Sequence, residues 1–193
     1  MARTPSTMLA LGTPAPAFAL PDFDGAMHSL GDFDASSALL VAFICNHCPF
    51  VRHIRDEFAR KAQAWRKRGV AVVAINSNDL VAYPQDGPDG MREEARSLGY
   101  DFPYLLDERQ SVARAYRAAC TPDFFLFDGS RRLVYRGQFD DSRPGNGRPV
   151  SGSDLQAAVD YVLAGRAPAR EQLPSLGCNI KWKTGNEPDY ADG

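Results

Sequence analysis

Cys45 and Cys48 stand two residues apart in the stretch FICNHCPF and are the residues of this sequence best suited to redox chemistry. Two thiols at this spacing form and break a disulfide, hold a soft metal ion, or act as a structural link. A link between them would close a loop of only four residues, worth ~2 kcal/mol and less than a long-range link gives. The spacing therefore favours a switch or a metal ligand over a structural bridge.

The two cysteines lie between a predicted strand and a predicted helix. Residues 38–44 form an apolar run typical of a strand buried on both faces, and apolar side chains recur with helical spacing over 49–68. Unpaired N–H groups at a helix N-terminus favour a thiolate and lower the pKa of a nearby cysteine. We predict that Cys45, as the more exposed thiol, is the nucleophile and that Cys48 resolves the mixed disulfide.

His47 lies between the two cysteines and is a candidate for tuning their pKa. A protonated imidazole would stabilise the thiolate, so we predict an oxidising pair, which a redox titration against glutathione would measure. The residue beside it, Asn46, leaves the size of this effect open. The simpler interpretation is a surface histidine with no role in the chemistry.

Periodicity predicts an α/β arrangement around the pair. The segments 38–44, 49–68 and 70–76 read as strand, helix and strand, which is a parallel βαβ unit. The remaining patterns predict helices at 89–98, 109–118 and 153–163, a strand at 102–107, and an antiparallel strand pair at 123–128 and 132–139. We predict a single domain over residues 1–193, with a core at about 12–165 and a tail at 166–193.

Composition narrows the classes of partner. The chain has 193 residues, 44% of them hydrophobic and 24% charged, and a formal net charge of -2, which gives no electrostatic reason to expect nucleic acid or an anionic membrane. Residues 1–16 lack the apolar core of a signal peptide, and no segment approaches a membrane span. We expect a cytoplasmic protein, in which a close cysteine pair is catalytic or metal-binding.

Several motifs resemble those of the alkyl hydroperoxide reductase/thiol-specific antioxidant (AhpC/TSA, redoxin) group of the thioredoxin-like superfamily. They are GTPAPAFAL at 12–20, CNHC at 45–48 and CTPDFFLFD at 120–128. The whole pattern resembles a bacterial group of uncharacterised thioredoxin-family proteins. The resemblance implies a thioredoxin-like fold, with a central mixed sheet flanked by helices, an N-terminal extension, an insertion and a C-terminal tail.

The resemblance also implies an activity. It points to a thiol–disulfide oxidoreductase in cell redox homeostasis that acts on a protein or small-molecule disulfide, uses no cofactor, and is reduced by a thiol donor that the sequence does not identify. In such folds the backbone of the residue at Thr121 pairs with the substrate peptide opposite the cysteines, and Pro122 is cis. Asn46 is the third residue expected at the substrate.

A peroxiredoxin-like thiol peroxidase is the alternative within the superfamily, with Cys48 as the peroxidatic cysteine. Such a site uses a threonine and an arginine to bind and polarise peroxide. Here Cys45 stands where that threonine would be, and no arginine directly precedes the strand 123–128. Arg117 and Arg143 are the candidates to replace the arginine. We therefore expect a disulfide, rather than peroxide, to be the main substrate.

A copper or zinc carrier is the alternative that is not an enzyme. Cys45 and Cys48 are soft ligands, and His47, His53 or Cys178 would have to complete the site. The sequence has no second pair of cysteines or histidines at ligand spacing, and the helical position of His53 predicts that it faces solvent. We therefore assign no metal ligands.

Two further cysteines belong to the candidate site. Cys120 is two residues before the predicted cis proline, so it is either an additional redox thiol or a small packed side chain. Cys178 lies in the tail and would be a resolving or gating cysteine if the tail folds over the site. Otherwise it is a buried anchor of the tail.

Polar residues at the strand ends are candidates for the rim of the site. Asn76, Ser77 and Asn78 end the strand beside the one that carries Cys45, and parallel strands gather ligands at their carboxyl ends. Asp140 and Arg143 lie in a Gly/Pro-rich stretch, 140–148, that we expect to form a flexible flap with polar contacts to the substrate.

Overall fold

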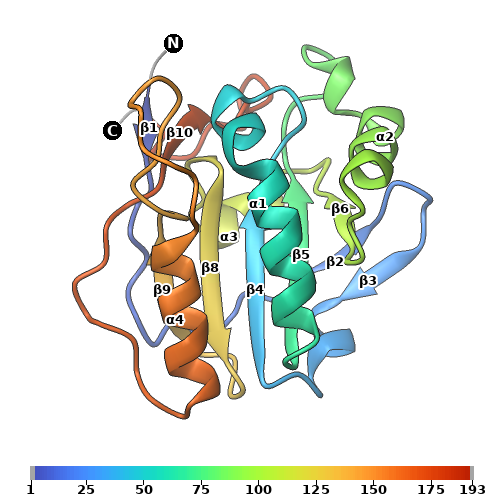
Figure 1. The fold of residues 1–193 in the computed structure, drawn as a ribbon. Coiled ribbons are helices and arrows are strands. Elements are labelled where there is room, and N and C mark those ends of the chain that lie inside the picture. The colour runs from blue at the N-terminus through green and yellow to red at the C-terminus, as the bar shows by residue number, and fades with distance from the viewer. Residues whose placement is uncertain (1–2, 192–193) are drawn as a thin grey trace.

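The computed structural model describes residues 3–191 (Figure 1). Its centre is a five-stranded mixed sheet with the strand order β6-β5-β4-β8-β9. The strands are β4 (Ala38–Phe43), β5 (Val70–Asn76), β6 (Tyr104–Leu106), β8 (Asp123–Asp128) and β9 (Leu133–Gly137). β4, β5 and β6 are parallel, whereas β8 is antiparallel to both β4 and β9. The parallel βαβ unit and the antiparallel strand pair are confirmed.

Helices cover both faces of this sheet. Helices α1 (Pro49–Arg66), α2 (Pro88–Leu98) and α4 (Ser153–Leu163) lie on one face, and α3 (Ser111–Ala115) lies behind the sheet in Figure 1. All six residues of β4 are buried because its alternate side chains enter different apolar clusters on the two faces. The central strand is thereby fixed in register, and its carboxyl end holds the cysteine pair.

Helix α1 positions the pair and follows the predicted periodicity. Its buried face is formed by Phe50, Val51, Ile54, Phe58, Ala59, Ala62 and Trp65. The helix ends at Arg66, two residues earlier than predicted, because the backbone N–H groups of Arg68 and Gly69 bond to Trp65 and Arg66 in a tighter turn. At the other end Cys48 is the N-cap and Pro49 the first helical residue, where no backbone donor is needed.

Other predicted elements are shorter in the structure. The strand predicted at 102–107 is limited to Tyr104–Leu106, the helix predicted at 109–118 to Ser111–Ala115, and the strand predicted at 132–139 to Leu133–Gly137. Helix α4 has its predicted limits, and its N-cap is Gly152. A Cβ at position 152 would lie 2.4 Å from the Phe139 ring, and φ is +60°, so the site requires glycine.

The tail returns across the molecule to the cysteine pair. Strand β10 (Leu176–Asn179) lies between β1 (Thr4–Pro5) and β7 (Cys120–Thr121) in a second, antiparallel sheet. A hairpin of β2 (Ala19–Pro21) and β3 (Met27–Ser29) and the 3-10 turns η1 (Leu30–Phe33) and η2 (Pro84–Asp86) complete the elements. Within residues 3–191, no helix combines the length and the apolar character that crossing a membrane requires.

Candidate active site

The two thiols lie below the surface at the start of α1. Cys45 is 1% exposed and Cys48 is 0% exposed, so Cys45 is the more exposed thiol only by a small margin and both are buried. Thr121 lies against both sulfurs. Its hydroxyl oxygen lies 3.5 Å from Cys45 Sγ, and its backbone oxygen lies 3.1 Å from Cys48 Sγ. The Thr121–Pro122 peptide bond is cis, as predicted.

Of the two thiols, Cys48 has the lowered pKa and Cys45 the raised one. Hydrogen bonds from the Cys45 thiol and from the backbone N–H groups of Val51 and Cys178 lower the pKa of Cys48 to about 5, although burial opposes this. The hydrogen bond to Cys48, burial and the nearby Asp86 carboxylate raise the pKa of Cys45. The lowered pKa expected for a cysteine at a helix N-terminus is therefore found at Cys48, the N-cap of α1, and not at Cys45.

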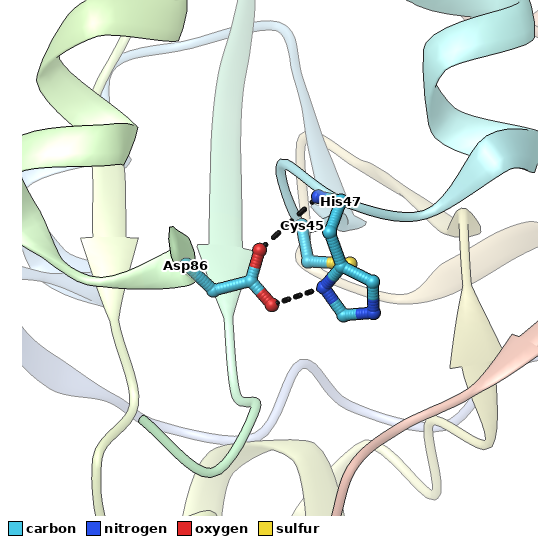
Figure 2. Close-up of side chains that lie close together, drawn as sticks. All are labelled: Cys45, His47 and Asp86. Carbon is cyan, nitrogen blue, oxygen red and sulfur yellow. Dashed lines mark hydrogen bonds and ion pairs between the residues drawn. The ribbon is translucent and has the colours of Figure 1, made fainter. Parts of the chain in front are cut away.

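Asp86, at the end of η2, organises the loop between the two cysteines and was missed by the sequence analysis. Its buried carboxylate accepts the backbone N–H groups of Asn46 and His47, at 3.0 and 3.2 Å, through Oδ1. Oδ2 accepts His47 Nδ1 at 2.5 Å and Asn78 Nδ2 at 2.8 Å. Figure 2 shows the carboxylate facing the imidazole beside Cys45. No local pattern around residue 86 indicated this contact.

His47 is held on two sides. Its ring bonds to Asp86 and stacks on Tyr83 with ring centroids 5.0 Å apart and planes 11° apart. Its Nδ1 is 3.9 Å from Cys45 Sγ. A proton on His47 would therefore face the negative Asp86 as well as the thiol, so the stabilisation of a Cys45 thiolate that we predicted for His47 is opposed by Asp86.

Removing the Asp86 charge is expected to lower the pKa of Cys45, since the carboxylate disfavours a thiolate beside it. The measurement is the pH profile of iodoacetamide alkylation at Cys45, read by peptide mapping, for Asp86→Asn in a Cys48→Ser background where the two thiols no longer titrate together. Asp89→Asn, on the exposed side of α2, is the matched control. An unchanged or higher pKa in Asp86→Asn would contradict the assignment.

The predicted rim residues lie at the site and bind other parts of the chain. Asn76 Nδ2 donates to the Asp86 backbone oxygen at 2.6 Å, and Asn78 donates to the carboxylate. Asn46 is 7% exposed, and its side chain bonds to Gln85 and to the hydroxyl of Tyr104. These asparagines position the cysteine loop, so the prediction that Asn46 reaches the substrate is not supported by its contacts.

Thr121 is paired with the tail of the same chain. In β7 it lies opposite Cys178 of β10, so its backbone is not open to a substrate peptide in the way that the resemblance implied. Cys178 is 4% exposed and is hydrogen-bonded to Cys48. Cys120 is fully buried, and its thiol lies 3.6 Å from the Pro122 backbone oxygen. The structure thus brings Cys178, and not Cys120, into contact with the pair.

The arginines proposed for peroxide binding are engaged elsewhere. Arg143 donates to the backbone oxygens of Asp140 and Ser142 and to Gln138. Arg117 lies over the Tyr190 ring at 4.6 Å. In the part of the chain that the structure describes, no arginine is hydrogen-bonded to either cysteine of the pair.

Asp140 anchors the segment that we predicted to be a flexible flap. Its carboxylate is buried and accepts the backbone N–H groups of Ser142, Ser151 and Gly152. Burial raises the pKa of Asp140 and these hydrogen bonds lower it, and the net result is a lowered pKa. The contacts of Asp140 do not support the prediction that it binds substrate, because its carboxylate oxygens are hydrogen-bonded to the loop that precedes α4.

The side chains that could hold a metal ion differ from those that a carrier was expected to need. His53 does not face solvent as predicted, because its Nε2 is buried and it lines a cavity with Phe50 and Pro122. Cys45, His47 and Asp86 instead place ligand atoms within 4.8 Å of one another. His47 Nδ1 and Asp86 Oδ2 are already bonded to each other, so this cluster fits a hydrogen-bond network better than a metal centre.

Comparisons with known proteins agree with this architecture. The chain is similar to the thiol-disulfide oxidoreductase ResA of Geobacillus thermodenitrificans, with 28% identity over 132 residues, covering 67% of this chain and 70% of that protein. It is also similar to the solved structure of a hypothetical protein from Sinorhizobium meliloti 1021, with 56% identity, a TM-score of 0.93, and 94% of this chain and all of that chain covered.

Two more solved structures extend the comparison. An uncharacterized conserved protein from Geobacillus kaustophilus is 52% identical with a TM-score of 0.92, covering 95% of this chain and 97% of that chain. A DsbE-type thiol:disulfide interchange protein from Chlorobium tepidum shares the fold, with 22% identity, a TM-score of 0.62, and 80% and 99% coverage. The thioredoxin-like fold is confirmed. The AhpC/TSA family model matches residues 11–136, more than half of the chain, and the chain therefore belongs to the AhpC/TSA family.

Proposed function

We propose that this protein is a thiol–disulfide oxidoreductase whose reacting groups are Cys45 and Cys48. The observation that carries the proposal is the hydrogen-bonded pair of thiols at the start of α1, with both sulfurs against Thr121 before the cis Pro122 and with the pKa of Cys48 lowered. A stabilised thiolate is the form that attacks disulfides and the form that leaves readily. The name of the ResA relative supports the same class of reaction.

The first step of the proposed reaction is attack by Cys45. The Cys45 proton passes to Cys48 along their hydrogen bond, and the Cys45 thiolate bonds to one sulfur of a substrate disulfide. The substrate's sulfur–sulfur bond breaks, and its second sulfur leaves as a thiolate that takes up a proton. The surroundings of the two sulfurs support this order. Cys45 lies beside His47, whose side chain is 19% exposed. Cys48 is enclosed by Val51, Thr121 and Cys178.

The second step is resolution by Cys48. As Cys48 gives up its proton and bonds to Cys45 Sγ, the bond between Cys45 and the substrate breaks and the second substrate thiol is released. One substrate disulfide is reduced to two thiols, and the protein is oxidised to the Cys45–Cys48 disulfide. An external thiol donor reverses this oxidation. The substrate is a protein or a small-molecule disulfide.

Thiol peroxidase activity is the second candidate, and the lowered pKa of Cys48 favours it. A peroxidatic cysteine reacts as a thiolate, and hydrogen bonds lower the pKa of Cys48 to about 5. The site supplies no arginine to polarise the peroxide, within the described residues, and Cys48 is fully buried. Disulfide exchange needs neither an arginine nor a bound peroxide, so we place it first.

The test feeds the reduced protein insulin disulfides in one reaction and hydrogen peroxide in another, and compares the initial rates. We expect turnover of the disulfide and a peroxide rate at least about tenfold lower, because no arginine of residues 3–191 is hydrogen-bonded to the pair to polarise a peroxide. Copper and zinc are measured in the same preparation after purification under reducing conditions. Faster peroxide turnover would favour the peroxidase, and stoichiometric metal would favour a carrier.

A further inference from the structure

The tail brings a third thiol to the redox pair. Cys178 lies in β10 directly opposite Thr121 of β7, and β1 pairs with the other edge of β10. The approach is close because the preceding residue is Gly177. A Cβ there would lie 2.0 Å from the Thr121 backbone oxygen, so no larger residue fits without moving the strand. Both neighbouring strands and the glycine therefore hold Cys178 at the active site.

The sulfur of Cys48 contacts two thiols. It is hydrogen-bonded to the Cys45 thiol and to both the backbone N–H and the thiol of Cys178. In contrast, Cys120 is directed to the Pro122 backbone oxygen. A sulfur that contacts two thiols can form a disulfide with either, because exchange needs the attacking sulfur in contact with the sulfur that it attacks.

We propose that Cys178 is a third redox thiol that exchanges with the Cys45–Cys48 disulfide, and this inference rests on the proposed function. The Cys178 thiolate attacks Cys48 Sγ, the Cys48–Cys178 bond forms, and the Cys45–Cys48 bond breaks. Cys45 leaves as a thiolate and takes up the proton that Cys178 lost. No oxidant or reductant is consumed, and the product has Cys45 reduced again and β10 tied covalently to the start of α1.

Charge sets the order of events. In the reduced site, burial and the negative Cys48 raise the pKa of Cys178 to about 12, so Cys178 remains a thiol. Formation of the Cys45–Cys48 disulfide removes the charge on Cys48 and makes its sulfur the electrophile. Exchange therefore follows oxidation of the pair. It returns the Cys45 thiol for a second reaction before the external donor acts.

The experiment maps disulfides after the protein is oxidised with oxidised glutathione, quenched in acid and alkylated. In the wild type we expect the Cys45–Cys48 bridge together with a Cys48–Cys178 bridge in about a tenth or more of the molecules. In Cys45→Ser, where Cys48 has one thiol neighbour left, we expect Cys48–Cys178 in most molecules and little glutathione on Cys48, because an intramolecular thiol competes at high effective concentration.

Two variants control for position and specificity. Cys120→Ser, which removes a buried thiol of the same strand pair, is expected to keep the Cys48–Cys178 bridge. Gly177→Ala keeps the Cys178 thiol but displaces its strand, and is expected to lower the yield of that bridge at least about tenfold. Circular dichroism verifies that each variant is folded. If Cys45→Ser does not fold, the presence or absence of the Cys48–Cys178 bridge in the wild type decides the outcome.

The outcomes separate this inference from the proposed function. A wild type that forms no Cys45–Cys48 bridge refutes the proposed function. A wild type that forms that bridge, with no Cys48–Cys178 bridge either in it or in folded Cys45→Ser, overturns the inference alone. A bridge between Cys48 and Cys120 would also overturn it, since it would mean that buried thiols pair without regard to the contacts described.

Discussion

Cys45→Ser and Cys48→Ser are each expected to lower the rate of insulin disulfide reduction by about a thousandfold, to the level of the added reductant alone. Cys45 makes the first bond to the substrate, so its serine variant cannot start the reaction. Cys48 breaks that bond, so its serine variant stops at the mixed disulfide. With one equivalent of substrate, Cys48→Ser is expected to accumulate a covalent adduct on Cys45, which mass spectrometry detects.

Cys120→Ser is the matched control for both variants, because Cys120 is as buried as the pair but its thiol bonds to a backbone oxygen instead. We expect it to retain activity within about threefold. An adduct that accumulates in Cys45→Ser and not in Cys48→Ser would reverse the roles of the two thiols. Rapid peroxide turnover that survives Cys45→Ser but not Cys48→Ser would replace the proposed function by the peroxidase.

Asp123 is expected to make the folded protein less stable as pH rises. Its carboxyl is fully buried at the start of β8, where burial raises its pKa to about 7 despite hydrogen bonds from Ser6 Oγ at 2.7 Å and the Ala119 N–H at 3.3 Å. In the unfolded chain the same group titrates near its ordinary value of 3.8. Between these pH values the folded state binds the proton more tightly, so stability is lost as pH increases.

Asp123→Asn removes this dependence. The free energy of unfolding of the variant minus that of the wild type is expected to rise by up to about 4 kcal/mol between pH 4 and pH 8. Urea unfolding at several pH values measures it, with the exposed Asp56→Asn on α1 as the control. A difference that stays constant across this range would mean that the pKa of Asp123 is not raised in the folded protein.

The elements that carry the cysteine pair could be predicted from the sequence alone. The limits of β5 and β8 agree with the predicted strands, and the buried face of α1 follows the predicted helical spacing. The pair itself was found from its spacing and from its place between an apolar run and an amphipathic segment. These features were predictable because period and composition act over a few neighbouring residues, and those residues decide which faces are buried.

The chemistry inside the site was decided by the tertiary structure. Asp86 reaches His47 from 39 positions along the chain, and Cys178 reaches Cys48 from the opposite end of the domain. Neither contact has a local pattern, since each depends on how η2 and β10 return to the start of α1. These contacts, together with the N–H groups directed at the helix cap, lower the pKa of Cys48 and raise that of Cys45. A pKa depends on which charges and donors surround a buried sulfur, and only the folded chain brings them together.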